Sequence, residues 1–348
     1  MASPKISKTN GGIYSWTRLS RDSLLDMRIC DLNLNLNTGQ LPARIQQLYR
    51  ELSRKYIAFQ PHFWLSDEWF CPDGVPGIAI PFYLAHPRLQ RLEQEFMMEV
   101  EGGDKIWCMK LLRHETGHAL LNAYKLDQRR DWRRHFGRPG SRYPDSYLPE
   151  PYSKEFAINL PDWYAQSHPH EDWAETFAVW LNPNSDWKLR YRSWPALKKL
   201  QYVDSLMTEI SEHRPRLRNQ RTHYPVQKIR TTLRSYYEDK TCRYGEDSPE
   251  FFDSDLRKLF EDKTAAPKAN KASRSIRAMR GELVAIVGRW SGEHKYRINL
   301  VLRDMIKRCD QLDLRATRSQ DDMLPELAAC VTMLVMNKLY SGGFHYAL

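Results

Sequence analysis

The sequence predicts an α+β fold, in which a small sheet and a long buried helix are followed by a mostly helical, basic C-terminal region. Three observations support this prediction. Residues 62–70 and 77–84 are rich in β-branched and aromatic side chains, and the turn-forming residues CPDGVPG separate them. Residues 104–126 form an apolar stretch with the pattern of a helix. Beyond residue 188, two long segments carry a large excess of Lys and Arg.

The first half of the chain is therefore expected to place a strand pair next to two helices. We expect residues 77–84 to be the edge strand, because Pro81 cannot donate a hydrogen bond to a neighbouring strand. Residues 87–99 are expected to form a helix, and residues 104–126 the long helix that follows it.

Length and composition indicate more than one domain. A chain of 348 residues with 41% hydrophobic and 12% aromatic residues exceeds one average domain and can bury a sizeable core. The segment TAAPKANKASRS is poor in apolar side chains and predicts a flexible linker. Residues 276–310 and 321–340 have the apolar periodicity of helices. The predicted organisation is an N-terminal extension at 1–40, a core domain at 41–215, a helical connector at 216–263, the linker at 264–275 and a basic helical module at 276–348.

Membrane and disulfide-rich classes do not fit the sequence. The first residues, MASPKISKTNGG, are polar and lack the apolar segment of a signal peptide. The longest mostly apolar run, Leu327–Met336, is too short to span a bilayer. The six cysteines have no CxxC spacing. We therefore expect a cytoplasmic protein with reduced thiols and no membrane contact.

The pentad His114-Glu115-Thr116-Gly117-His118 lies inside the long predicted helix. Residues four apart on a helix share one face, so both imidazoles can bind one zinc ion while Glu115 acts on the attacking water. Gly117 in mid-helix costs about 1 kcal/mol relative to Ala, which indicates a packing reason. The pentad indicates metal-assisted hydrolysis; the alternative is a structural helix with a half-buried His pair and a solvated Glu.

A zinc site of this kind needs a third protein ligand from elsewhere in the chain. In a metzincin, positions 121 and 124 would be Gly and His, but here they are Leu121 and Tyr124. The Gly-Thr motif with an Asp ligand that an aspzincin needs is absent. A gluzincin instead takes a Glu from a second helix, usually with an acidic residue four positions later. Glu171 and Glu175 have that spacing within the segment PDWYAQSHPHEDWAETFAVWL. His170 and Asp172 are the alternative third ligands.

The pentad HETGH followed by YAQSHPHEDWAETFA resembles the zinc-binding metallopeptidase family of bacteria, whose second motif is close to SHPWEDWAETFAHYL. The resemblance covers about residues 40–215. His170 stands where that family commonly has Trp, and the Cys-rich zinc ribbon that many members carry is absent. More distantly, the segment from Tyr164 to Glu175 resembles the equivalent helix of anthrax lethal factor.

The resemblance implies a zincin-like core that binds one Zn²⁺ per chain. The implied ligands are His114, His118 and Glu171, with an open fourth position. Glu115 is implied to take the proton of the attacking water and to deliver it to the leaving amine. Tyr164 is implied to donate to the developing oxyanion, and Glu175 to accept the remaining ring N–H of a ligand His. Alternatively, Glu175 is a solvated helix residue and Tyr164 an ordinary surface or core aromatic.

The implied activity is zinc-dependent hydrolysis of a peptide or related amide bond in a peptide or protein substrate. An extended peptide is expected to add a strand to the edge formed by residues 77–84. The Arg-, Tyr- and Pro-rich residues 127–160 are a candidate lid. The alternative function is a zincin-like sensor or scaffold that acts through its basic helical region on nucleic acid or a protein partner.

Charge is distributed unevenly along the chain. Residues 188–230 contain 11 Lys and Arg against 3 acidic residues, and residues 265–308 contain the same numbers. One interpretation of this Arg-rich, aromatic-poor helical region is nonspecific electrostatic contact with nucleic acid. The other is a solvated helix bundle that caps the preceding domain or binds an acidic protein, and we favour it because runs of charge are usually solvated faces.

Overall fold

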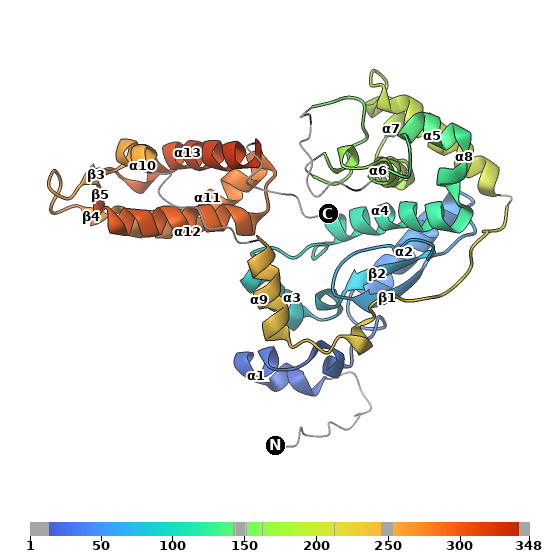
Figure 1. Ribbon diagram of the computed structural model, residues 1–348, viewed down its shortest axis with the longest axis horizontal. Helices are drawn as coiled ribbons and strands as arrows, with labels where there is room; N and C mark the ends of the chain where they lie inside the picture. The colour runs from blue at the N-terminus through green and yellow to red at the C-terminus, as the bar shows by residue number, and fades with distance from the viewer. Residues whose placement is uncertain are drawn as a thin grey trace. The chain divides into compact units, whose positions relative to one another are not determined.

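The computed structural model describes residues 14–141, 143, 150, 152–161, 163–211, 213–244 and 253–340 (Figure 1). The described residues contain thirteen α-helices, one two-stranded sheet and one three-stranded sheet. The predicted α+β fold is confirmed. Parts of five predicted segments lie outside the described residues: 1–13 of the extension, 142, 144–149 and 151 of the candidate lid, 162 and 212 of the core domain, 245–252 of the connector and 341–348 of the helical module.

The described chain divides into two compact units. Residues up to 237, apart from 96–99, form the first unit, and residues 96–99 together with those from 238 onward form the second. The two segments that resemble a metallopeptidase both lie in the first unit.

The sheet of the first unit consists of β1 (His62–Ser66) and β2 (Gly77–Pro81), which pair in parallel. Both strands are shorter than expected, and a 3₁₀ turn at Phe82–Ala85 follows β2 directly after Pro81. All five residues of β2 are buried. The N–H of Ala79 donates to the carbonyl of Phe70 at 2.8 Å, so the chain itself occupies β2 at this residue. Among the described strands β2 pairs only with β1, so it is an edge strand as predicted, and Phe70 covers this edge at Ala79.

Helices make up most of the first unit. Their bounds are α1 (Arg21–Leu25), α2 (Leu41–Arg54), α3 (Pro87–Met97), α4 (Lys105–Tyr124), α5 (Arg130–Phe136), α6 (Pro169–Leu181), α7 (Trp187–Arg190), α8 (Ala196–Ser211) and α9 (Leu233–Tyr244). The boundaries of the first unit fall within α3 and α9.

The long predicted helix is α4, and capping residues define both its start and its end. The Asp104 side chain accepts the N–H of Trp107 at its start, and Lys125 adopts a left-handed conformation with φ 54° at its end. Helix α4 packs against α6, α2 and β2 (Figure 1). A helix that is buried on most faces needs apolar residues nearly all round, and outside the pentad Arg113 is the one charged residue among the buried residues of α4.

A buried ion pair connects α4 to α2. The Nε and Nη2 atoms of Arg113 donate to the two carboxylate oxygens of Glu51 at 2.8 and 2.9 Å, and both side chains are buried. This two-point contact fixes the rotation of α4 next to His114, because Arg113 precedes it directly.

Replacing Glu51 by Gln is expected to lower the free energy of unfolding by about 3–5 kcal/mol, because the Arg113 charge is left buried without a countercharge. Denaturant unfolding measures this loss. The matched control is Asp31→Asn, which breaks the exposed Arg28–Asp31 pair and is expected to change stability by less than about 1 kcal/mol. Equal losses in the two variants would contradict a structural role for the buried pair.

The second unit has its own hydrophobic core, formed between four helices. These are α10 (Asp253–Leu259), α11 (Ala272–Ser291), α12 (Lys295–Gln311) and α13 (Gln320–Tyr340). Three short antiparallel strands, β3 (Glu261–Asp262), β4 (Asn270–Lys271) and β5 (Leu314–Ala316), pair in the order β3-β5-β4.

The helix and linker bounds observed in the second unit differ from two expectations of the sequence analysis. The helical pattern at 276–310 belongs to two helices, because Gly292 ends α11 with φ 75°. Residues 270–275, expected in the linker, lie in β4 and in the first turn of α11.

None of the six cysteines, all within the described residues, is in a disulfide. Among the helices that the structure describes, none combines the length and the apolar character that crossing a membrane requires.

Candidate metal centre

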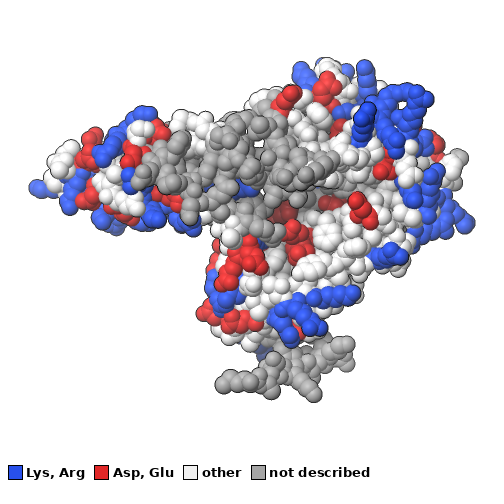
Figure 2. Space-filling view, in the orientation of Figure 1, with Lys and Arg blue, Asp and Glu red and all other residues white. Residues whose placement is uncertain are grey.

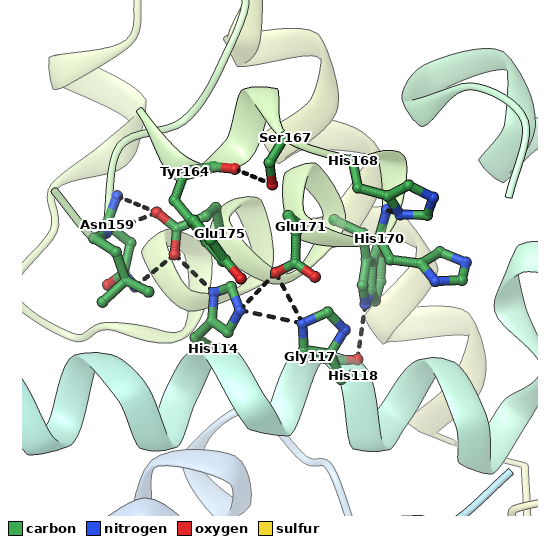
Figure 3. A network of polar contacts seen from close by, with 12 residues as sticks. His114, Gly117, His118, Asn159, Tyr164, Ser167, His168, His170, Glu171 and Glu175 are labelled. Atoms are coloured by element: carbon green, nitrogen blue, oxygen red, sulfur yellow. Dashed lines mark hydrogen bonds and ion pairs between the residues drawn. The ribbon is translucent and has the colours of Figure 1, made fainter. Parts of the chain in front are cut away.

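Helices α4 and α6 carry the two sequence motifs and face each other (Figure 3). The pentad occupies the middle of α4. At the start of α6, the ring nitrogen Nδ1 of His168 accepts the N–H of His170 at 3.1 Å, and Pro169 is the first helical residue. This cap places Glu171 in the first turn of α6.

The two helices approach most closely at Gly117. A Cβ atom at this position would lie 2.9 Å from the Cα atom of Ala174, closer than real Cβ contacts allow. The indole N–H of Trp173 donates to the carbonyl of Gly117 at 2.8 Å (Figure 3). The helices can therefore come together because both facing residues are small, which is the packing reason that a mid-helix glycine indicates.

Three potential ligand atoms converge between the helices. The Nε2 atoms of His114 and His118 lie 3.0 and 3.2 Å from Oε2 of Glu171, and 3.1 Å from each other (Figure 3). Four-coordinate zinc with bonds of about 2.0–2.1 Å separates its ligand atoms by about 3.3 Å. The three side chains thus have the spacing of a tetrahedral zinc site.

The charge balance at His114 also favours a cation. Its Nδ1–H donates to Oε1 of Glu175 at 2.8 Å, so a neutral ring presents a lone pair at Nε2 toward the carboxylate of Glu171. Burial disfavours the protonated ring, but the hydrogen bonds to Glu171 and Glu175 outweigh it and raise the pKa of His114 well above its usual range. A proton or a metal ion between Nε2 of His114 and the Glu171 carboxylate removes the repulsion between the lone pairs of the nitrogen and the oxygen.

Glu175 is buried and fully hydrogen-bonded. Besides His114, its Oε1 accepts the side-chain N–H of Asn159 at 2.9 Å. Its Oε2 accepts the backbone N–H groups of Asn159 at 3.0 Å and Leu160 at 2.7 Å. A carboxylate held by these donors fixes the orientation of the His114 ring.

Glu115 is buried beside the histidine pair and lines a cavity of about 260 Å³. Burial raises the pKa of its carboxyl group, whereas His118 and His114 lower it. Its Oε2 has no hydrogen-bond partner among the described residues. A buried polar atom of this kind needs water or a ligand, and the cavity provides the space.

Two tyrosines border the same cavity. Tyr164 lies in a 3₁₀ turn, Tyr164–Gln166, with its ring centre 5.6 Å from that of His114. The hydroxyl of Tyr143 donates to Oε1 of Glu171 at 2.9 Å, and its ring stacks on His168 at 3.8 Å. Burial and the charge of Glu171 raise the pKa of Tyr143, so its hydroxyl remains a donor.

Tyr143 was not among the residues predicted from the sequence. It lies in the irregular segment 127–160, where no periodicity indicates which side chains turn inward, and its partner is 28 residues away. Its position in the suggested lid was the one signal available.

Glu171 lies next to the histidine pair in the structure. The two alternative ligands, His170 and Asp172, do not belong to this cluster of ligand atoms. Oδ2 of Asp172 pairs with Nζ of Lys199 at 2.7 Å. His170 lines the cavity, where burial, followed by the charges of His118 and His168, lowers its pKa to about 4.

Residues 109–188 match the model of a family described as "Putative zinc-binding metallo-peptidase". The resemblance predicted from the two motifs is confirmed over these residues. The matched residues include the pentad, the segment that carries Tyr143 and all of α6. No curated protein and no solved structure gives a significant match to the chain.

Replacing Gly117 by Ala is expected to lower the free energy of unfolding by about 1–3 kcal/mol, because the added methyl group collides with the backbone of α6. The separation of α4 and α6 should also reduce bound zinc. Thermal unfolding and elemental analysis measure both effects.

The control for this variant is Gly281→Ala in α11, where an added Cβ meets no atom within 4 Å. This change is expected to stabilise the protein by up to about 1 kcal/mol, as Ala does in a helix interior. A Gly117→Ala variant with the stability and zinc content of the wild type would rule out the close approach of the two helices.

Proposed function

We propose that the first unit is a zinc-dependent metallopeptidase that hydrolyses a peptide or related amide bond. The observation that carries the proposal is the convergence of two imidazole nitrogens and one carboxylate oxygen within 3.2 Å of one another. The segment that holds them matches a metallopeptidase family. The ligand set His114, His118 and Glu171 is of the gluzincin type, with one zinc ion per chain.

Zinc bound by this ligand set supplies Lewis-acid activation of the attacking water and of the scissile carbonyl. Two neutral imidazoles and one carboxylate suit zinc, and a set of three protein ligands is typical of catalytic zinc sites.

Glu115 is the general base and then the general acid of the proposed reaction. Its unpartnered Oε2 lies buried at the wall of the cavity, where it can accept a proton from the attacking water. Burial raises its pKa, and this makes the protonated carboxyl group a competent donor to the leaving amine.

The other side chains hold the reacting groups in place. Glu175 orients the ring of His114 through Nδ1, and Tyr143 orients the carboxylate of Glu171 through Oε1, which leaves Oε2 for the metal. Tyr164, next to His114 at the cavity, is the proposed donor to the oxyanion.

Replacing Glu171 by Gln is expected to abolish zinc binding, because a neutral amide is a poor third ligand. Elemental mass spectrometry should find about one zinc per chain in the wild type and little in this variant. Glu115→Gln is the matched variant: it should keep zinc and lose peptide hydrolysis by at least about 100-fold. Full zinc content in Glu171→Gln would exclude Glu171 as a ligand, and full activity in Glu115→Gln would exclude the base.

Replacing Tyr143 by Phe is expected to weaken zinc binding about 10- to 100-fold, because the carboxylate of Glu171 loses its orienting donor. Competition with a chelator measures the affinity. Tyr56→Phe is the control, since Tyr56 is exposed and lies outside the cavity. Equal affinities in the two variants would show that Tyr143 does not support the metal.

A further inference from the structure

A second cavity in the first unit, of about 830 Å³, is lined by four arginines and three other residues. Its walls are formed by Arg130, Arg133, Arg134 and Arg138 together with residues 139–141. All four arginines are exposed. Figure 2 shows Lys and Arg gathered over the region of α5 and α8.

The carboxylates next to this cavity are already used by a different arginine. Arg129 pairs with Glu209 at 2.7 Å and with Asp131 at 3.2 Å. Arg133 donates to the backbone carbonyl of Asp127, which carries no charge. Within the described part of the chain, Arg130, Arg134 and Arg138 have no carboxylate at ion-pair distance. No described carboxylate offsets their mutual repulsion, which salt or a bound anion would relieve.

The lining of the cavity determines which anion fits. Guanidinium groups bind phosphate through two parallel hydrogen bonds. Pro139 is the main apolar lining residue and no aromatic ring lines the cavity, so it lacks the aromatic platforms on which proteins stack bases. Acidic side chains of an extended peptide alternate between two faces, whereas a nucleic acid carries one charge per nucleotide along a continuous backbone.

We propose that this arginine cavity binds the phosphodiester backbone of a nucleic acid without preference for base sequence. The cavity borders the segment that leads to the metal centre. Ser141 lines the cavity, and its carbonyl accepts the Nε2–H of His168, on which Tyr143 stacks. Nucleic acid bound here lies beside the peptidase site, whether or not that site is active.

The test is fluorescence anisotropy of the full-length chain with a labelled single-stranded oligonucleotide over a series of salt concentrations. The variant Arg130→Ala/Arg134→Ala/Arg138→Ala is expected to bind about 10- to 100-fold more weakly. It should also reduce the slope of log affinity against log salt by about 2–3, because three phosphate contacts are lost. The corresponding Arg→Lys triple variant keeps the charge but loses the two-point hydrogen bonds, so it should keep the salt dependence and bind with an affinity between those of the wild type and the Ala variant.

The matched control is Lys268→Ala/Arg274→Ala/Arg289→Ala, which removes the same charge from exposed positions of the second unit. It is expected to bind within about twofold of the wild type, since the lost charges lie outside the arginine cavity. Comparable zinc contents and unfolding midpoints would show that both triple variants are folded.

Three results would overturn the proposal. The first is the absence of binding by the wild type at low salt. The second is equal weakening by both Ala variants or greater weakening by the control, which would assign binding to overall charge or to the basic helical region. The third is displacement of the oligonucleotide by polyglutamate more readily than by unlabelled oligonucleotide of equal charge, which would indicate an acidic protein partner.

Discussion

The close approach of α4 and α6 is the constraint on which the candidate metal centre depends. The two histidines come from α4 and the carboxylate of Glu171 comes from α6. The distance between the histidine nitrogens and this carboxylate therefore depends on how closely the two helices pack. Gly117 and Ala174 leave no room for a larger side chain at the crossing. The Trp173 indole fixes the register by its hydrogen bond to the Gly117 carbonyl. Without this contact, the ligand atoms would belong to two independent surfaces.

Around this crossing, two buried carboxylates fix the positions of α4 and of the His114 ring. Glu51 fixes α4 through Arg113, and Glu175 connects His114 to the backbone of residues 159–160. Each is buried with its hydrogen bonds satisfied, so each is expensive to disturb from one side only. The histidine rings are consequently oriented by the fold itself, and a ligand entering the cavity finds them already in place.

The parts of the site predicted from the sequence are those whose geometry is local. A spacing of four on a helix determines which side chains share a face, and this is enough to pair His114 with His118 and Glu171 with Glu175. Tyr143 could not be found in this way, because an irregular segment has no repeating geometry and its contact with α6 is tertiary. The division of residues 276–310 into two helices was missed for a similar reason. The apolar periodicity continues across Gly292, whereas the helix ends there because Gly292 adopts a left-handed backbone conformation.

The hydrogen bond between Ala79 and Phe70 has a consequence for how a substrate is recognised. A strand that is already partnered offers fewer free amides to an incoming peptide, so the main chain of the substrate contributes less to affinity. In the proposed peptidase, selectivity would then come mainly from side chains that enter the cavity, where Trp69 and Asp73 lie beside His114 and His118. Such a site would distinguish its substrates by residue type more than by contacts with their backbone.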